Sequence, residues 1–137
     1  MTGALKLTRR YRFSASHRLD TPALTPDQNQ RLYGKCNNPY GHGHDYVLDV
    51  TVEGPIDGNG QVAGRAALDA LVNQRVLQRF DHKNLSKDVA GLAGVVATTE
   101  NLAEAIRDAL ITDWPLDARL ARVRISETDR NIFELEI

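Results

Sequence analysis

The sequence predicts an α+β protein in which an antiparallel sheet of four strands carries two helices on one face. Three features of its hydropathy pattern support this class. Apolar and polar residues alternate in two long segments near the amino terminus, apolar residues then follow helical spacing through the middle of the chain, and the alternation returns at its end. The expected order of elements is therefore β-β-α-α-β-β.

Two strands are expected in the first part of the chain. Residues 5–17 alternate between an apolar and a polar face, and the apolar face ends on His17. Residues 42–53 alternate in the same way, and both His42 and His44 fall on the apolar face because side chains two apart on a strand point the same way. The two strands thus direct three titratable rings toward the core.

The middle of the chain is predicted to contain a long connection and two helices. Residues 18–41 include three prolines and two glycines, and they are expected to form a loop whose length is typical of functional loops. Apolar spacing predicts one helix over 65–79. A second is expected to begin near Thr98, which can act as its N-cap, and to end at Trp114.

The last two strands are predicted over 121–127 and 133–137, on either side of a turn at 129–130. A four-stranded open sheet leaves two unpaired edges, which are an aggregation hazard unless something covers them. We therefore expect symmetric oligomerisation to close the sheet.

Composition limits the classes of function. The 137 residues are expected to form one domain, 1–137, and the formal net charge of −1 gives no field that attracts nucleic acid or an anionic membrane. No apolar run approaches the roughly 18 residues of a membrane span. The single cysteine, Cys36, excludes an intrachain disulfide framework and suits a reducing cytoplasm. We therefore expect a cytoplasmic protein without nucleic-acid or membrane partners.

The three histidines on inward strand faces predict a metal site. Each ring alone could be a hydrogen-bonded core residue, but three at strand ends, with His42 and His44 at ligand spacing, favour metal binding. His17 can supply a third ligand if the two strands pair. Catalytic zinc sites commonly use three protein ligands and keep a fourth position open, and imidazole nitrogens suit zinc.

Cys36 allows three interpretations. It can be a thiolate ligand beside the histidines, a nucleophile or base next to the metal, or an inert buried thiol. Its polar surroundings, punctuated by proline and glycine, disfavour the inert case. The neighbouring Lys35 and a nearby cation could lower the pKa of the thiol.

The carboxylates of Asp81 and Glu127 are further candidates for functional groups. Asp81 precedes His82 at the exit of a predicted helix, where a carboxylate can orient an imidazole for acid–base work, although adjacent side chains need not touch. Glu127 ends an apolar strand face, and a carboxylate there needs hydrogen-bond donors. A planar heterocycle with an amino group and a ring N–H would satisfy both of its oxygens.

The chain resembles a known family along nearly its whole length, the 6-pyruvoyltetrahydropterin synthases and their 6-carboxytetrahydropterin synthase relatives. Five stretches carry the resemblance, in order along the chain: FSASHRL (13–19), YGKCNNPYGHGHDY (33–46), DHKNL (81–85), VVATTENLA (95–103) and SETDRNI (126–132).

The resemblance implies roles for individual residues. The zinc ligands would be His17, His42 and His44. Cys36 would then be the general base and not a ligand, and Asp81 and His82 would form a proton-relay pair. Glu127 would anchor the amino-pyrimidine edge of the pterin, in a pocket that Thr99 and Glu100 would line.

The resemblance also implies an assembly and a reaction. Members of the family have the T-fold, in which subunits form a ring whose sheets close into a barrel, and two rings stack into a hexamer, a dimer of trimers. Active sites lie between subunits. The implied activity is that of a zinc-dependent carbon–oxygen lyase that converts 7,8-dihydroneopterin triphosphate to 6-pyruvoyltetrahydropterin by eliminating triphosphate, in tetrahydrobiopterin biosynthesis.

Two features of the sequence resemble those of the pyruvoyl-forming branch of the family. Five residues separate Cys36 from His42, whereas the carboxy-forming members of queuosine biosynthesis usually have three, and TTEN at 98–101 also looks pyruvoyl-like. Alternatives are a 6-carboxy-5,6,7,8-tetrahydropterin synthase or a dual-activity enzyme. Outside the family, the alternatives are a cupin-like metal enzyme, because cupins also place His-x-His on a strand, and a non-enzymatic, zinc-stabilised module.

Overall fold

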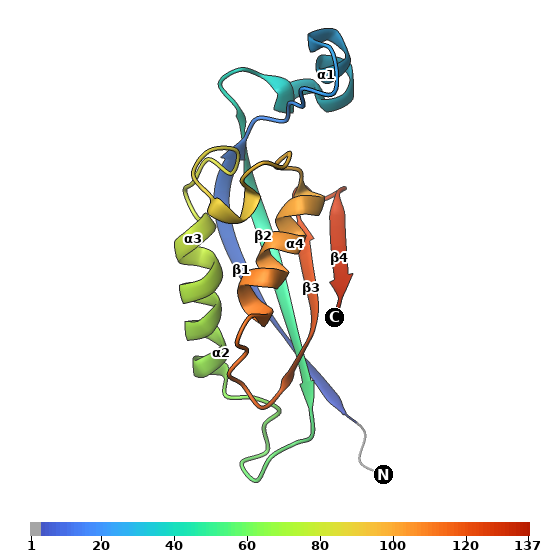
Figure 1. Cartoon of the computed structure of the whole chain (residues 1–137). Helices are drawn as coiled ribbons and strands as arrows, with labels where there is room; N and C mark the ends of the chain where they lie inside the picture. Colours follow the sequence, from blue (N-terminus) through green and yellow to red (C-terminus); the bar gives the residue numbers. More distant parts are fainter. Residues whose placement is uncertain (1–3) are drawn as a thin grey trace.

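The computed structural model describes residues 4–137, and its centre is an antiparallel sheet (Figure 1). The four strands lie side by side in the order in which they follow along the chain. They are β1 Leu5–His17, β2 His42–Gly54, β3 Arg119–Ser126 and β4 Ile132–Glu136. Every neighbouring pair is antiparallel, so the predicted sheet is confirmed.

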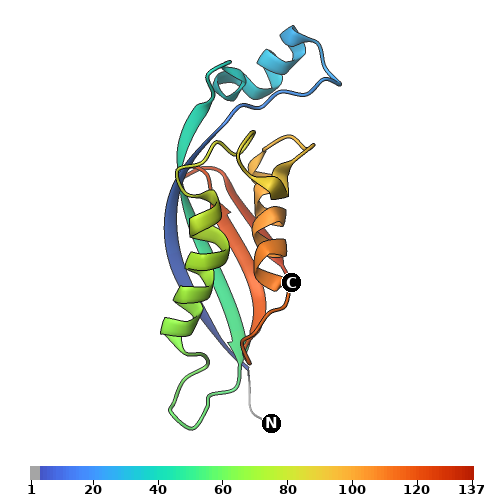
Figure 2. The ribbon, with the colours of Figure 1, turned by 60° about the vertical axis from the view of Figure 1, so that its left-hand side comes forward.

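One face of the sheet is covered by two helical segments (Figures 1 and 2). The first is continuous and consists of α2 Arg65–Val72, a π-helical turn η2 Asn73–Leu77, and α3 Gln78–Phe80. The second is α4 Thr99–Ile111, preceded by a short 3-10 turn, η3 Ala90–Leu92. Thr98 caps α4 as predicted, because its hydroxyl oxygen accepts a hydrogen bond from the backbone N–H of Asn101. The predicted α+β class with two helices on one face is therefore confirmed.

The core lies between this face of the sheet and the helices. β2 contributes four fully buried side chains from alternate positions, those of Tyr46, Leu48, Val50 and Val52. Apolar stripes of the helices pack against them, and these stripes contain Leu68, Val72, Val76, Leu102, Ile106 and Leu110. Burying each such aliphatic side chain stabilises the fold by about 1.5–3 kcal/mol. The histidine-bearing ends of β1 and β2 continue the same face, so the core fixes their position.

The opposite face of the sheet is polar. The guanidinium group of Arg10 on β1 donates two hydrogen bonds, of 2.8 and 3.1 Å, to the buried carboxylate of Asp49 on β2. This hydrogen-bonded ion pair lowers the pKa of Asp49. The hydroxyl oxygens of Thr8 and Thr51 are 2.7 Å apart across the same two strands. Polar side chains thus occupy the positions that the alternating pattern assigned to them.

The connection 18–41 differs from the loop that its prolines and glycines predicted. It contains α1 Pro26–Tyr33 and a 3-10 turn, η1 Gly34–Asn37, which stand beyond the ends of β1 and β2 (Figure 1). A capping box starts α1, because Thr25 and Gln28 each accept a hydrogen bond from the backbone N–H of the other. Apolar spacing could not predict this helix, since its eight residues, PDQNQRLY, lack an apolar stripe.

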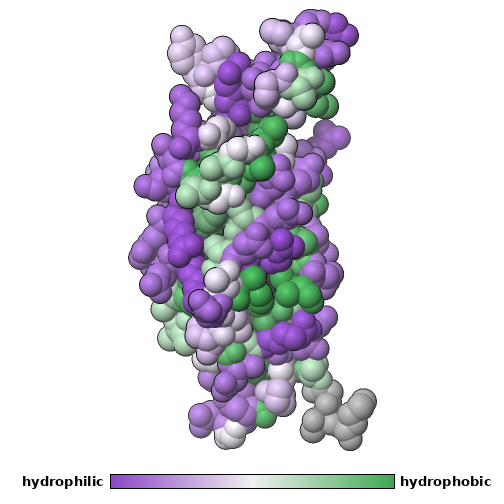
Figure 3. All heavy atoms as spheres, viewed as in Figure 1, coloured by the Kyte–Doolittle hydropathy of each residue, from purple (hydrophilic) through white to green (hydrophobic). Residues whose placement is uncertain are grey.

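The sheet of one chain is open, with β1 and β4 at its edges. Part of the β1 edge is covered, because the backbone of Ser14 and Ser16 exchanges hydrogen bonds with residues 82–85. Ile132 and Ile137 are 43% and 39% exposed at and just beyond the ends of β4. Figure 3 shows hydrophobic residues at the surface between hydrophilic ones. Within residues 4–137, none of the helices combines the length and the hydrophobicity that crossing a membrane requires.

Candidate metal site and active site

The pairing of β1 with β2 brings the predicted histidines together. His17 lies opposite His42 in the register, and Ala15 lies opposite His44. Directly opposite residues share a face of the sheet, as do residues two apart on one strand. The three rings therefore gather on the helix-covered side, where the strands end. The expectation that the two strands pair at His17 is confirmed.

The ring nitrogens of these histidines converge. His17 Nε2 is 3.1 Å from His44 Nε2, and His42 Nδ1 is 3.4 Å from the same atom. His17 is fully buried, and its Nδ1 lies 2.8 Å from the carbonyl oxygen of Ala97. Because a carbonyl only accepts hydrogen bonds, Nδ1 carries the proton and Nε2 presents a lone pair to the other rings. Ala97 thus fixes both the tautomer and the orientation of a metal-ligand candidate.

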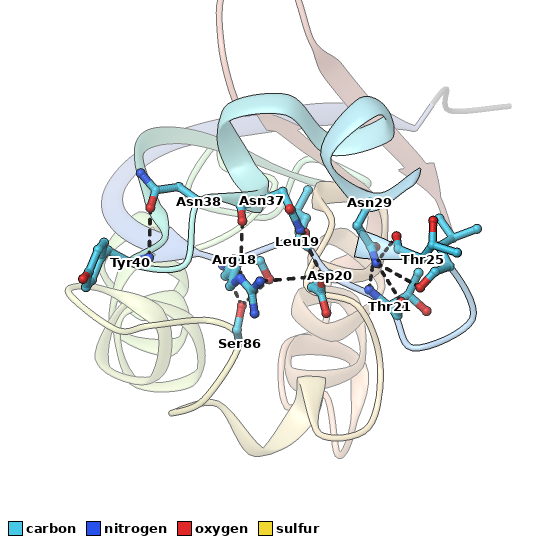
Figure 4. A network of polar contacts seen from close by, with 11 residues as sticks. Arg18, Leu19, Asp20, Thr21, Thr25, Asn29, Asn37, Asn38, Tyr40 and Ser86 are labelled. Carbon is cyan, nitrogen blue, oxygen red and sulfur yellow. Dashed lines mark hydrogen bonds and ion pairs between the residues drawn. The ribbon is translucent and has the colours of Figure 1, made fainter. Parts of the chain in front are cut away.

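Cys36 reaches the histidines from η1. The backbone N–H of Leu19 donates to the carbonyl oxygen of Cys36 at 2.7 Å, and the side chain of Asn37 donates to the carbonyl oxygen of Leu19 at 2.7 Å. Figure 4 shows Leu19 and Asn37 in a network of polar contacts, in which the chain after β1 and the chain before β2 continue side by side. The sulfur of Cys36 consequently lies 3.4 Å from His17 Nε2 and 3.7 Å from His44 Nε2.

The network in Figure 4 also anchors α1, which leads into Cys36. Asn29 on α1 is buried, and its amide nitrogen donates to the carbonyl oxygens of Thr21, Leu24 and Thr25. The amide oxygen of Asn29 accepts from the backbone N–H of Thr21 at 2.9 Å. The projecting helix is therefore tied to the segment that follows His17, and not only to its own ends.

Glu127 completes the cluster from the end of β3. Its Oε1 lies 3.3 Å from His44 Nε2, and its Oε2 accepts a hydrogen bond from the hydroxyl group of Thr99 at the start of α4. Thr99 is buried, whereas Glu100, the next residue, is exposed in the first turn of the helix. The structure thus places Thr99 in the site. Among the described residues, no hydrogen bond or ion pair joins Glu100 to it.

Four side chains form a set of possible metal ligands, which we call the four-residue cluster: His17, Cys36, His44 and Glu127. One ligand atom from each lies within 4.8 Å of the others. The set shares His17 and His44 with the predicted ligands, and His42 lies next to it through its contact with His44. Nitrogen, sulfur and carboxylate donors of this kind bind divalent metals such as zinc.

Burial controls the protonation of the cluster in the absence of a bound ion. It lowers the pKa of His17 and of His44, so both rings are neutral near pH 7 and available as ligands. It also raises the pKa of the Cys36 thiol, and the negative charge of Glu127 raises that pKa further. The expected lowering by Lys35 is therefore not found, and Lys35 itself is exposed. The chain alone keeps Cys36 protonated.

Asp81 and His82 lie apart from the four-residue cluster. Asp81 Oδ1 is 3.0 Å from His82 Nδ1 and also accepts a hydrogen bond from the backbone N–H of Ser14. The side chain of His82 is 82% exposed, and its φ of 58° is in the left-handed region. The two side chains are in contact, so the carboxylate of Asp81 can orient the imidazole of His82. His82 lines a surface cleft of about 530 Å³ that also borders Ser14 and His44.

Some residues of the site were not predicted. The carbonyl group of Ala97 has no sequence signal, because any residue supplies one. A second cleft of about 710 Å³ adjoins His42 and brings together Arg18, Lys35 and Asn37. Tyr46 shares the inward face with His44, and the edge-to-face contact between the two rings has a centroid distance of 5.7 Å. The alternation over residues 42–53 puts Tyr46 on the inward face, but this pattern by itself indicates only a core residue.

The fold and the site define an α+β protein with a candidate divalent-metal site at one end of its sheet. A family model described as 6-pyruvoyl tetrahydropterin synthase matches residues 6–137. The chain therefore belongs to the 6-pyruvoyl tetrahydropterin synthase family. Its four-stranded sheet with packed helices also departs from the helix-poor double-sheet barrel of a cupin.

Individual relatives agree with this assignment. The 6-pyruvoyl tetrahydrobiopterin synthase of Homo sapiens is 47% identical over 128 residues, which cover 93% of this chain and 88% of that protein. The protein of the same name from Dictyostelium discoideum is 41% identical over 132 residues, or 96% and 95% of the two chains. The structure of Caenorhabditis elegans 6-pyruvoyl tetrahydropterin synthase superposes with a TM-score of 0.91 at 36% identity and covers 99% of this chain and 97% of that one. These relatives support the pyruvoyl-forming branch.

Proposed function

We propose that the protein is a zinc-dependent 6-pyruvoyltetrahydropterin synthase that converts 7,8-dihydroneopterin triphosphate to 6-pyruvoyltetrahydropterin and triphosphate. One observation carries the proposal: in a chain of this family, a thiol, a carboxylate and the rings of His17 and His44 meet within 4.8 Å. The reaction balances internally. The pyrazine ring gains the two hydrogens that the side chain loses, and triphosphate leaves by elimination, so no external oxidant or reductant is required.

The donor set fits zinc. A tetrahedral zinc ion with Zn–N bonds of about 2.0–2.1 Å separates its nitrogen ligands by about 3.3 Å. The nitrogens of His17 and His42 lie 3.1 and 3.4 Å from that of His44. We assign these three histidines as the ligands. A bound zinc ion would supply Lewis-acid polarisation of the substrate and positive charge beside the thiol.

Cys36 is assigned as the general base. Its sulfur lies within 3.7 Å of two of the proposed ligands, so it can face a substrate held at the open coordination position. Its pKa is raised by burial and by Glu127. The thiol therefore becomes a base only when a cation lies beside it, because nearby positive charge favours the thiolate. This requirement links metal binding to the appearance of the base.

Glu127 is assigned as the anchor of the pterin. One of its oxygens already accepts from Thr99, and the other lies toward His44. An amino-pyrimidine edge offers an amino group and a ring N–H, which a carboxylate can receive as two parallel hydrogen bonds. Thr99 then orients the carboxylate. Glu100, exposed in the first turn of α4, lines the rim of this pocket in the proposal.

Asp81 and His82 are assigned as a proton relay that serves a site in another subunit. The pair is exposed and makes no hydrogen bond to the four-residue cluster among the residues described. Both sheet edges carry exposed apolar residues, Leu5 on β1 and Ile132 on β4, which suits lateral pairing of sheets into a ring. In a hexamer of two such rings, with sites between subunits, the pair would approach Cys36 of a neighbour.

The cleft beside His42 suits the leaving group. Arg18 and Lys35 line it together with the amide side chain of Asn37. Two cations and an amide donor next to the proposed zinc site can hold a polyanion while the pterin ring lies on the Glu127 side.

Mass analysis of the product tests the proposal. The zinc-loaded protein is incubated with 7,8-dihydroneopterin triphosphate, and the Cys36→Ala variant is the control. A product with a three-carbon side chain, accompanied by free triphosphate, supports the pyruvoyl reaction. A carboxylate product with released acetaldehyde would instead show the carboxy-forming reaction of queuosine biosynthesis. If the substrate is unchanged although zinc is bound, the alternative of a non-enzymatic, zinc-stabilised module would be supported.

A further inference from the structure

Residues 82–86 run parallel to the end of β1 and pair with that part of its edge. Their backbone exchanges two hydrogen bonds with that of Ser16, of 3.0 and 2.7 Å, and these bonds form the parallel bridge between Ser16 and Asn84. Hydrogen bonds are evenly spaced along a parallel ladder. The next bridge of this ladder would therefore join Arg18 to Ser86, just beyond the end of β1.

A side chain replaces the backbone at this next bridge. The chain turns away after Asn84, whose carbonyl oxygen accepts from the backbone N–H groups of residues 87–88 at 3.1 and 2.8 Å. The hydroxyl group of Ser86 instead accepts from the backbone N–H of Arg18 at 2.9 Å and donates to the carbonyl oxygen of Arg18 at 3.0 Å. Ser86 is itself fixed, because its backbone N–H donates to the amide oxygen of Asn84 at 2.9 Å. Ser86 therefore holds both backbone groups of the residue that follows His17.

Two further groups direct the side chain of Arg18. Its Nε donates to the carbonyl oxygen of Asn37 at 3.3 Å, and its Nη2 lies 3.7 Å from Oδ1 of Asp20. Figure 4 shows Ser86, Asn37 and Asp20 around Arg18. A guanidinium group carries five N–H donors in one plane, so these contacts leave donors for a ligand. Arg18 borders the cleft of about 710 Å³ beside His42, and both its backbone and its side chain are held there.

The orientation of Arg18 matters for the binding of phosphate in this cleft. Lys35 also lines the cleft, but its ammonium group acts as a point charge on a flexible stem, whereas a planar guanidinium group binds phosphate through two parallel hydrogen bonds. Asp27 lines the cleft as well, and its carboxylate pairs with Arg31. Because a bidentate contact depends on direction, a displacement of the Arg18 backbone weakens it.

We propose that Ser86 is a positioning residue for phosphate recognition. By holding the backbone of Arg18, its hydroxyl group keeps the guanidinium plane where it binds the triphosphate group of the substrate. Ser86 acts through Arg18 and not by contact, because the described residues that line the cleft do not include it. Without this hydroxyl group, Arg18 gains conformational freedom that binding must remove again, which lowers the affinity. The inference rests on the proposed function, in which this cleft holds the triphosphate.

Two pterins that differ only in phosphate test this role. They are 7,8-dihydroneopterin triphosphate and 7,8-dihydroneopterin, and each is titrated by fluorescence into zinc-loaded protein that carries Cys36→Ala, so that conversion is slow. Adding Ser86→Ala is expected to raise the Kd of the triphosphate about fivefold, to change the Kd of 7,8-dihydroneopterin by less than about twofold, and to leave the zinc content unchanged. Ser86→Thr, which keeps a hydroxyl group, should restore the Kd of the parent.

Two further variants show whether the effect is specific and whether it passes through Arg18. Thr21→Ala is the matched control, because the Thr21 hydroxyl accepts from the backbone N–H of Ala23 in the same connection, and no hydrogen bond among the described residues joins it to Arg18. It should change neither Kd. In an Arg18→Ala background, Ser86→Ala should change the Kd of the triphosphate by less than about twofold.

The outcomes separate this inference from the proposed reaction. An unchanged triphosphate Kd in Ser86→Ala overturns the inference, and so does an equal rise for both ligands, which would mean that Ser86 supports the whole site. A fivefold rise that persists in the Arg18→Ala background also overturns it. Because the titrations measure binding alone, a parent that shows the expected discrimination but forms no three-carbon product would overturn the proposed reaction and leave the role of Ser86 intact.

Discussion

The four-residue cluster and the Asp81–His82 pair contain similar side chains in opposite surroundings. In the cluster, His17 is fully buried, and its three partners come from three other segments of the chain. In the pair, two adjacent residues touch, and His82 is almost entirely in solvent. One chain therefore brings the candidate metal ligands together by itself but leaves the Asp81–His82 pair facing outward. The difference is what the proposed assembly, with sites between subunits, would require.

The largest effect is expected from removing the central ring of the cluster. His44→Ala should reduce bound zinc from about one ion per chain to a trace and abolish turnover, because the other nitrogens are arranged around His44. Elemental analysis after dialysis measures this. The matched control is His82→Ala, which should keep its zinc. If His44→Ala retains zinc, or if His82→Ala loses it, metal binding has been assigned to the wrong one of the two regions.

Removing the thiol separates metal binding from catalysis. Cys36→Ala should lower kcat by about 10²–10⁴-fold, the range for a lost general base, while zinc content and pterin affinity remain close to those of the parent. Steady-state kinetics and metal analysis test this together. If Cys36→Ala loses zinc as well, the cysteine is a ligand and the alternative of a Cys-His-His site is correct.

Mixing inactive variants tests whether the pair serves a neighbouring subunit. Cys36→Ala and His82→Ala, unfolded together and refolded as mixed oligomers, should regain activity at about a quarter of their sites, because only those combine an intact cysteine with an intact pair. Asp81→Asn mixed with His82→Ala is the control and should stay inactive, since no subunit in that mixture has an intact pair. Absence of recovery in the first mixture would place the whole site in one chain.

The smallest effect concerns the pH dependence of stability in the chelated protein. The folded-state pKa values of His17 and His44 lie below the ordinary value of 6.5, so the unfolded chain binds protons that the folded chain does not. Stability is then complete above pH 6.5 and decreases as the pH falls toward the folded values, by at most about 1.4 kcal/mol per pH unit for each ring.

Urea unfolding between pH 7.5 and 5.5 measures this slope. The His17→Ala variant should show a shallower slope than the parent, because one buried ring is gone. A parent protein that becomes more stable as the pH falls through this range would contradict the burial argument.

The sequence by itself determined the strands, the two long helices and the candidates for the site. Alternation placed His17, His42 and His44 on one face, and the fold confirms that placement because a strand of period two leaves no other face for them. The N-cap at Thr98 and the apolar stripes of the two helices are also local patterns, so the sequence alone predicted them. The capping box at Thr25 was present as well, but it lies in a segment without an apolar stripe, so α1 was missed.

Only the tertiary structure decided how these candidates relate to one another. Local patterns do not report distances between segments far apart in the chain, so the bond between His17 and the carbonyl group of Ala97 had no sequence signal. Cys36 beside the histidines was only one of three interpretations, and only the family resemblance placed Thr99 with Glu127. The protonation state of Cys36 likewise depends on the tertiary structure. Lys35 next to Cys36 suggested an activated thiol, yet burial sets the pKa in the opposite direction, because desolvation depends on packing and not on the neighbouring residue in the chain.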